Sequence, residues 1–278
     1  MVSTFSNGDP PLAMISLKDG RWTGTWQPRG VPSQVTITLT AEVPGTSVRG
    51  SAQLLGGVQS NRLAPQVDSG GIASILAPGG IVSIFGLRLA DSQTTSSQLP
   101  LPIELGGASV LLGAQALPLF SASEQRIDAQ VPYDVSVNAR HQLIVRRGNS
   151  YTVPESVTVA AARPIVISIY NGQTAVDPEH PLQAGDTITL NCSGLGAVDP
   201  PSRAGTPAPA DPLSRVTNLV SVTVGGFDAK VNSAVLTPGT SGLYQVSATV
   251  PDGIPTGDAQ ILLSVAGQTS PSVMVTIR

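Results

Sequence analysis

The chain has 278 residues, of which 12% are charged, and its formal net charge is −3. Gly and Pro supply 29 and 24 residues, while lysine occurs only at Lys18 and Lys230. Charged helix formers are scarce and helix breakers are spread along the whole chain, so the composition favours strands and turns. Without clustered Lys and Arg or a long apolar stretch, the sequence argues against nucleic-acid partners and against membrane insertion.

Residues 1–62 carry the first strand signals, and we expect them to form a small partial β-domain. Turn residues separate four candidate strands at 12–17, 21–26, 35–43 and 48–55. In the third, Val35, Ile37, Leu39 and Ala41 alternate with threonines, which predicts a strand with one buried face. Four strands are few for a closed sandwich, so this segment is either the tail of a larger β-domain or a small sheet that packs on the next domain. The polar, glycine-rich residues 61–71 indicate a linker.

The rest of the chain contains an internal repeat. Residues 78–85 and 184–191 both place a glycine turn before an alternating strand, at an offset of 106 positions. Hairpin signals at 109–118 and 221–231 follow, and then strand signals at 127–132 and 246–251. The last strands are 142–145 with 156–159 in one copy and 260–263 with 274–277 in the other. Because order, spacing and turn chemistry agree, we predict two copies of one fold.

About seven short strands per copy, with frequent turn signals between them, are typical of antiparallel sandwiches. The expected fold class is therefore all-β, with tandem immunoglobulin-like antiparallel β-sandwiches preceded by the partial β-domain. The expected domains are residues 1–62, 63–162 and 163–278. We expect the last domain alone to carry a long proline-rich loop, at residues 197–215.

Several motifs in the repeat resemble a known family. They are GIVSIFG at 80–86, QRIDAQVPY at 125–133, GLGAVDP at 194–200, APADPL at 208–213 and GLYQV at 242–246. Residues 72–278 resemble the paralogous C-terminal domain of large acidobacterial (Solibacter-type) secreted proteins, and each half resembles the IPT/TIG group of immunoglobulin-like domains. The resemblance implies a sandwich fold and a secreted or cell-surface location at the end of a longer polypeptide. It supplies no catalytic residues, and because the first 15 residues lack signal-peptide features, any export signal is expected upstream.

The sequence offers little catalytic chemistry, and we predict neither an enzyme nor a cofactor. His141 and His180 have no cysteine or carboxylate at metal-site or triad-like spacing. Cys192 lies in an apolar run and is expected to be buried. Asp199 and Asp211 could offer oxygens to Ca²⁺, although Asp before Pro is a common turn device and turn formation is the favoured interpretation.

Two features are candidates for binding. The loop at 197–215 could be a recognition arm, or a strap across a sheet edge, which its apolar Val198 and Leu213 favour. Its candidate interaction residues are Pro200, Arg203, Pro207, Pro209 and Asp211. Trp22 and Trp26, four apart in an expected strand, would share one face and could stack on sugar rings, although packing in a small core is the favoured alternative.

Two hypotheses of function follow. The first is a noncatalytic structural, adhesive or assembly module of an exported protein, whose partners are other protein chains bound by edge-strand or end-to-end contact. The second is a carbohydrate-binding accessory module of a secreted hydrolase, whose partner is a surface polysaccharide.

Overall fold

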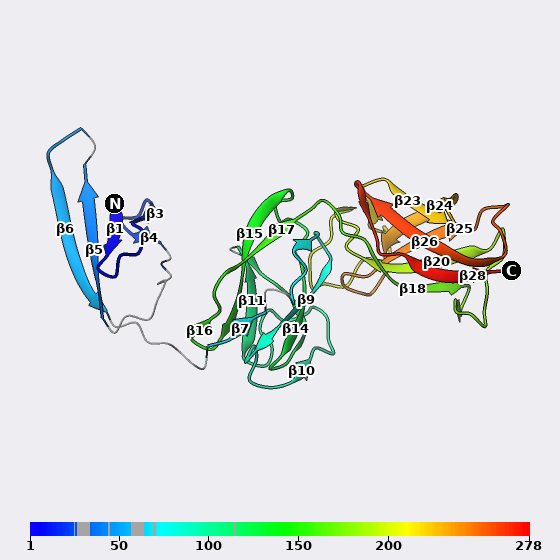
Figure 1. Ribbon diagram of the computed structural model, residues 1–278, viewed down its shortest axis with the longest axis horizontal. Helices are drawn as coiled ribbons and strands as arrows, with labels where there is room; N and C mark the ends of the chain where they lie inside the picture. Colours follow the sequence, from blue (N-terminus) through cyan, green and yellow to red (C-terminus); the bar gives the residue numbers. More distant parts are fainter. Residues whose placement is uncertain (25, 27–33, 44, 57–63, 69–70, 114) are drawn as a thin grey trace. The chain divides into compact units, whose positions relative to one another are not determined.

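The computed structural model describes residues 1–278 apart from 25, 27–33, 44, 57–63, 69–70 and 114. All regular elements among the described residues are strands, so the predicted all-β class is confirmed. No described segment forms a helix suited to crossing a bilayer. The chain divides into two compact units, Met1–Leu63 and Ala64–Arg278 (Figure 1).

The N-terminal unit is built on one four-stranded antiparallel sheet of order β2-β1-β5-β6. Its strands are β1 (Val2–Phe5), β2 (Leu12–Ala13), β5 (Val35–Glu42) and β6 (Arg49–Gly56). A separate hairpin pairs β3 (Ile15–Ser16) with β4 (Trp22–Thr23). The strands predicted at 12–17 and 21–26 are therefore much shorter than expected, and β1 was not predicted, because four residues show too little alternation.

The apolar side chains of β5 are less buried than their alternating pattern predicts. Val35 is buried, but Ile37, Leu39 and Ala41 on the same face are only half-buried. Every residue of β6 is exposed. The threonines of β5 are half-buried as well, so burial does not distinguish the two faces of β5, and among the described residues the only other sheet of this unit is the short hairpin of β3 and β4.

Residues 64–162, which we call module 1, form a sandwich of two sheets. One has the order β10-β13-β14-β9-β7 and the other β12-β11-β15-β17-β8, with β16 on β15. The strands are β7 (Gln66–Val67), β8 (Ile75–Leu76), β9 (Ile81–Leu87), β10 (Thr94–Thr95), β11 (Ala108–Leu112), β12 (Gln115–Ala116), β13 (Leu119–Ala122), β14 (Arg126–Gln130), β15 (Ala139–Arg147), β16 (Ser150–Tyr151) and β17 (Glu155–Val159). β8 pairs with β17 in parallel, while the other pairings of the module are antiparallel. Inward residues of both sheets, such as Ile84, Leu112 and Leu143, form its core.

Residues 163–278, module 2, repeat this arrangement. The strands are β18 (Ile165–Asn171), β19 (Thr174–Ala175), β20 (Thr187–Ser193), β21 (Val198–Asp199), β22 (Arg215–Val216), β23 (Val220–Val224), β24 (Phe227–Leu236), β25 (Tyr244–Thr249), β26 (Gly257–Val265), β27 (Gln268–Thr269) and β28 (Val273–Ile277). β24 takes part in both layers, because its first residues pair with β23 and its residues from Lys230 onward pair with β25, with a register shift between Val231 and Ser233. One hydrogen-bonded path therefore joins the two sheets.

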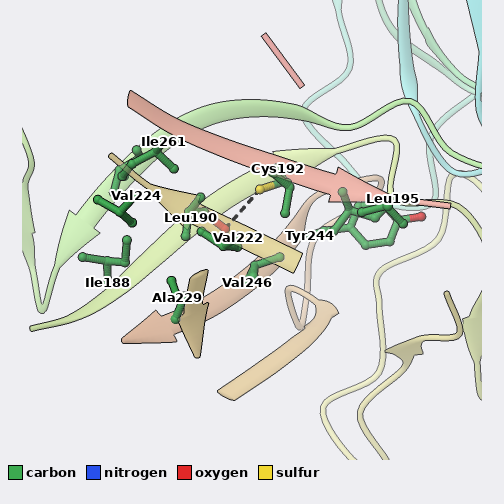
Figure 2. Packing of buried hydrophobic residues seen from close by; sticks show 14 of the residues in the cluster. Ile188, Leu190, Cys192, Leu195, Val222, Val224, Ala229, Tyr244, Val246 and Ile261 are labelled. Atoms are coloured by element: carbon green, nitrogen blue, oxygen red, sulfur yellow. Dashed lines mark hydrogen bonds between the residues drawn. The ribbon is translucent and has the colours of Figure 1, made fainter. Parts of the chain in front are cut away.

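The core of module 2 gathers inward side chains from both layers, among them Leu190, Val222 and Ile261 (Figure 2). Cys192 is fully buried in it, as predicted, and its thiol contacts the Leu190 carbonyl oxygen at 3.4 Å. Burial raises the pKa of the Cys192 thiol to about 12. The thiol is therefore a packing group and not a reactive nucleophile.

Strand pairing confirms the predicted repeat. β9 pairs with β14 as β20 pairs with β25, and β11 with β15 as β23 with β26. The parallel pairing of β8 with β17 corresponds to a parallel bridge between Leu182 and Ile277.

The structure corrects two expectations about these modules. The described part of the expected linker at 61–71 contains β7, a strand of module 1 that pairs with β9 as β18 pairs with β20. A two-residue strand in a polar stretch carries no periodic signal, so it was missed. Module 1 also has a long connection of its own, residues 88–107 between β9 and β11, interrupted by the two-residue strand β10, so such a connection is not confined to module 2.

The two modules each bury a side-chain hydroxyl at an equivalent position. Thr152 Oγ1 accepts a hydrogen bond from the Val145 amide at 3.0 Å, and Ser270 Oγ accepts one from the Leu263 amide at 3.1 Å. Both hydroxyl-bearing residues are buried. Each hydroxyl supplies an acceptor for a core-strand amide just beyond the last paired residues of the short strands β16 and β27.

We expect Ser270→Ala to lower the free energy of unfolding of module 2 by about 1–3 kcal/mol, since the buried Leu263 amide would lose its acceptor. Urea denaturation followed by circular dichroism measures the loss. The control is Thr269→Ala, an exposed neighbour, which should change stability by less than about 0.5 kcal/mol. Equal effects of the two substitutions would contradict the role of the buried hydroxyl.

Candidate functional site: the junction between the two sandwiches

One buried amide stands at the centre of the contacts between modules 1 and 2. Gln130 ends β14 and is 0% exposed. Its Oε1 accepts hydrogen bonds from the Gly205 amide at 2.6 Å and from the Ser241 hydroxyl at 2.7 Å, both in module 2. Its Nε2 donates to the Gly79 carbonyl oxygen at 3.3 Å in module 1. One side chain therefore satisfies polar groups of both modules, as a buried amide must.

Two tyrosines extend this junction. The Tyr244 hydroxyl donates to the Gly196 carbonyl oxygen at 2.6 Å and lies 3.5 Å from the Pro78 carbonyl oxygen of module 1. Tyr133, from module 1, packs against the core of module 2. Burial raises the pKa of Tyr133 to about 12 and holds the pKa of Tyr244 well above its ordinary value. Both phenols stay neutral near neutral pH, so they serve as hydrogen-bonding and packing groups.

The backbone joins the modules as well. The Ile81 amide of module 1 donates to Ser193 Oγ of module 2 at 3.0 Å. The Leu101 amide donates to the Gly205 carbonyl oxygen at 2.7 Å. With Gln130, these bonds attach three separate stretches of module 1 to module 2.

The proline-rich loop at 197–215 supplies one of those attachments. Its two ends pair as β21 and β22, and Val198 is buried in the core of its own module, as the strap interpretation expected. Its middle, however, crosses to module 1 at Gly205. That residue has a positive φ of 79°, and an added Cβ would lie 2.8 Å from the Pro118 Cβ, so only glycine fits. The loop therefore packs on module 2 and also binds module 1 through Gly205. We call residues 197–215 the clamp.

A groove of about 940 Å³ runs beside the clamp. Its walls are largely apolar and come from both modules, with prolines at 100, 118, 132 and 201. The exposed side chains of Asp134 and Arg203 line it as well. The rest of the described lining consists of proline, aliphatic and small polar residues together with Tyr133 and Gln115.

The predicted loop residues are dispersed. Arg203 lines the groove, whereas Pro207 and Asp211 are exposed and Pro200 and Pro209 are half-buried outside its lining. Asp199 is exposed in β21, opposite Arg215 of β22. Across the described chain, no three His, Cys, Asp or Glu side chains gather as a metal site would require. Calcium binding at Asp199 and Asp211 stays a prediction.

The two tryptophans do not share a strand face as expected. β4 ends at Thr23, so Trp26 lies beyond it and stacks on Phe5 with ring centroids 4.4 Å apart. The Trp26 Nε1 also donates to Asp9 Oδ2 at 2.8 Å. Trp22, by contrast, is 42% exposed. The favoured alternative, core packing, therefore fits Trp26, and Trp22 alone presents an indole to solvent.

His141 lies half-buried in module 1, and His180 lies exposed in module 2. His180 Nδ1 lies 2.9 Å from Asp177 Oδ1, and the hydrogen bond from His180 holds the pKa of Asp177 below its usual value. His141 Nε2 lies 2.8 Å from the Ser136 carbonyl oxygen. Neither contact brings a nucleophile to the ring.

Sequence reasoning missed the residues that build the junction. Gln130 and Tyr133 belong to the motif at 125–133, and Tyr244 belongs to the motif at 242–246. These motifs indicated a family resemblance but not a contact between modules. A usable signal was present, because Gln130 follows the alternating strand residues Ile127 and Ala129 and ends the strand before Val-Pro-Tyr. A polar residue at a strand end beside apolar neighbours is a candidate for an interface.

No model of a known protein family matches this sequence, and no curated protein matches it either. Among solved structures, a Bacteroides ovatus mixed-linkage glucan utilization locus protein, SGBP-B, solved with a mixed-linkage heptasaccharide, is 15% identical with a TM-score of 0.37. The match covers 100% of this chain but 59% of that protein. The titin Ig tandem A164–A165 is 12% identical over 77% of this chain and 96% of its own, with a TM-score of 0.22. Domains 5–6 of the S-layer protein SbsC are 14% identical over 76% and 94%, with a TM-score of 0.23. At such identities no residue role passes from these proteins to this chain.

We expect Gln130→Leu to destabilise the two-module unit by about 2–5 kcal/mol, because Gly205 and Ser241 would each keep a buried donor without an acceptor. Urea denaturation of the full chain measures this. Gln142→Leu, at an exposed position of β15, is the control and should stay within about 0.5 kcal/mol of the wild type. A Gln130 variant that unfolds at the wild-type urea concentration would refute the role given to the amide.

Proposed function

We propose that this chain is a noncatalytic structural and assembly module of an exported protein, in which residues 64–278 act as one stiff element. The observation that carries the proposal is the Gln130 amide, which is fully buried and bonded to both modules. Rotation of one module against the other would expose or orphan these polar groups, and orphaned buried groups are costly. A module pair that holds a fixed orientation suits a spacer better than a flexible tether does.

The extracellular part of the proposal has separate support. Residues 72–278 resemble C-terminal domains of secreted acidobacterial proteins, which are placed at the end of long polypeptides. Immunoglobulin-like sandwiches suit such work, because their edge strands and end loops offer contact surfaces without a catalytic cleft.

The stiffness can be measured as a distance distribution between spin labels on the two modules of the full chain. We choose Val153→Cys in module 1 and Leu219→Cys in module 2, which are 56% and 87% exposed, while the native Cys192 is buried and should remain unlabelled. Pulsed electron double resonance should give one narrow distribution. Adding Gln130→Leu should broaden it, because the clamp would lose its central acceptor.

The same labels with Gln142→Leu provide the control, which should keep the narrow distribution. A broad distribution in the otherwise wild-type chain would overturn the proposal of a stiff element. Retention of the narrow distribution in the Gln130 variant would show that another contact fixes the orientation.

Carbohydrate binding is a second candidate, favoured by the exposed Trp22 indole on the β3–β4 hairpin. A free aromatic face can stack on a sugar ring, although here one indole acts without the second that the sequence suggested. On a glycan array, any binding should weaken about tenfold or more in Trp22→Ala. Ile15→Ala, which removes another exposed apolar side chain of the same hairpin, should leave it unchanged. Equal binding by both variants would exclude a site at Trp22.

A further inference from the structure

Among the described residues, the outer strand of the N-terminal unit has no pairing partner on its far side. β6 lies at the end of the sheet order, next to β5, and all eight of its residues are exposed (Figure 1). Its pairing with β5 runs from Arg49 to Gly56 without a register shift. It therefore offers a long, regular row of backbone donors and acceptors on its far side.

Most of the described strands that end a sheet in the two sandwiches are much shorter than β6, and β28, which pairs with β26 and through one bridge with Leu182, spans five residues. β7, β10, β12, β19 and β27, which end sheets or hairpins there, each span two residues. Short edge strands are one means by which proteins avoid pairing with other chains. β6 also lacks proline, lysine and a bulge, which are other such means.

The hydrogen-bonding pattern shows which residues of β6 face outward. The Val43 amide donates to the Val48 carbonyl oxygen at 3.2 Å, so this opposite pair is hydrogen-bonded. Bonded and non-bonded pairs alternate in an antiparallel ladder. The backbone groups of Gly50, Ala52 and Leu54 therefore point to β5. Those of Arg49, Ser51, Gln53 and Leu55 point away from the sheet.

We infer that β6 pairs with β6 of a second copy of this chain, antiparallel and centred on Ala52. Hydrogen bonds between the two strands can form only where residues whose backbone groups point away from the sheet lie opposite one another. In this register, every such residue of β6 has a partner of the same kind. It sets Ser51 opposite Gln53 of the second copy and Arg49 opposite Leu55 of the second copy. About eight N–H···O bonds would join the copies.

Side chains agree with this register on both faces. Gly50 has open space where a Cβ would stand, and it would lie opposite the exposed Leu54 of the second copy. Ala52 would lie opposite Ala52 of the second copy. On the apolar face of the pair, each small residue would therefore lie opposite either Leu54 or another small residue. Ser51 and Gln53 form a polar pair on the other side. The two Arg49 side chains would stand at opposite ends of the pair, so like charges do not meet.

Pairing in this register also joins the half-covered apolar faces. Ala52 and Leu54 lie opposite Leu39 and Ile37 of β5, on the face where both β5 residues are only half-buried. The joined sheet would carry this face across both copies without a break. A contiguous apolar surface of that kind favours association.

The inference names a partner for the assembly part of the proposed function, but its test is independent of stiffness. Labels within a single chain report the junction of modules 1 and 2, whereas pairing of β6 is read from the association of whole chains. Either result can fail while the other holds.

Cysteine crosslinking of the full chain tests the register. In the inferred pair Ala52 occupies a non-bonded position, where opposite Cα atoms lie about 4.5 Å apart, which a disulfide can bridge. Ala52→Cys should therefore give a dimer under mild oxidation with copper phenanthroline. The control is Leu54→Cys, on the same exposed face, whose equivalents would lie about 13 Å apart and should not crosslink. Fluorescence of Trp22 and Trp26, the only tryptophans, confirms that the N-terminal unit of each variant is folded.

Sedimentation velocity over a range of concentrations tests the association itself. The wild type should dimerise, and Gln53→Lys should raise the dissociation constant about tenfold, since the new charge would lie diagonal to Arg49 of the second copy. Gln142→Lys adds the same charge to an interior strand, β15, and should have no effect. A monomeric wild type, equal effects of the two lysines, or crosslinking of Leu54→Cys as readily as Ala52→Cys would overturn the inference.

Discussion

The amide of Gln130 is the constraint on which residues 64–278 depend. An amide removed from water must find partners for both its oxygen and its nitrogen, and here the partners belong to different modules. This requirement brings Gly205 against Pro118 and thereby fixes the course of the proline-rich loop. The groove beside the loop exists because the same contact holds its two walls together.

The repeat explains how much of this architecture the sequence predicts. The sequence predicts strands that are long enough to show alternating apolar residues, such as β9 and β20, because one buried face imposes a period of two. Strands of two residues have no period, so the sequence around β7 predicts a linker and not a strand. The junction was missed for a different reason. Gln130 is buried because module 2 packs on it, and the residues next to Gln130 in the sequence do not indicate the position of module 2.

The N-terminal unit shows the limit of the same reasoning. The alternation in β5 identifies an apolar face, but alternation does not provide a sheet to cover it. Trp26 was expected on a strand face with Trp22, and instead it covers Phe5. With few aromatic side chains in the chain, one of the two indoles supplies the packing that a second sheet supplies in the modules, while the other remains in solvent.

The parallel pairing at the ends of each module has a mechanical consequence. In module 2 the Leu182 amide donates to the Thr276 carbonyl oxygen and the Arg278 amide donates to the Leu182 carbonyl oxygen, which joins the segment after β19 to the last strand. In module 1 the Ala160 amide donates to Leu76 in the corresponding place. When two parallel strands are pulled from opposite ends, their hydrogen bonds bear the load together in shear and do not open one after another. Tension along the polypeptide would therefore load these short parallel pairs in shear, after the pairing of β7 with β9 and of β18 with β20, which lies nearer the start of each module.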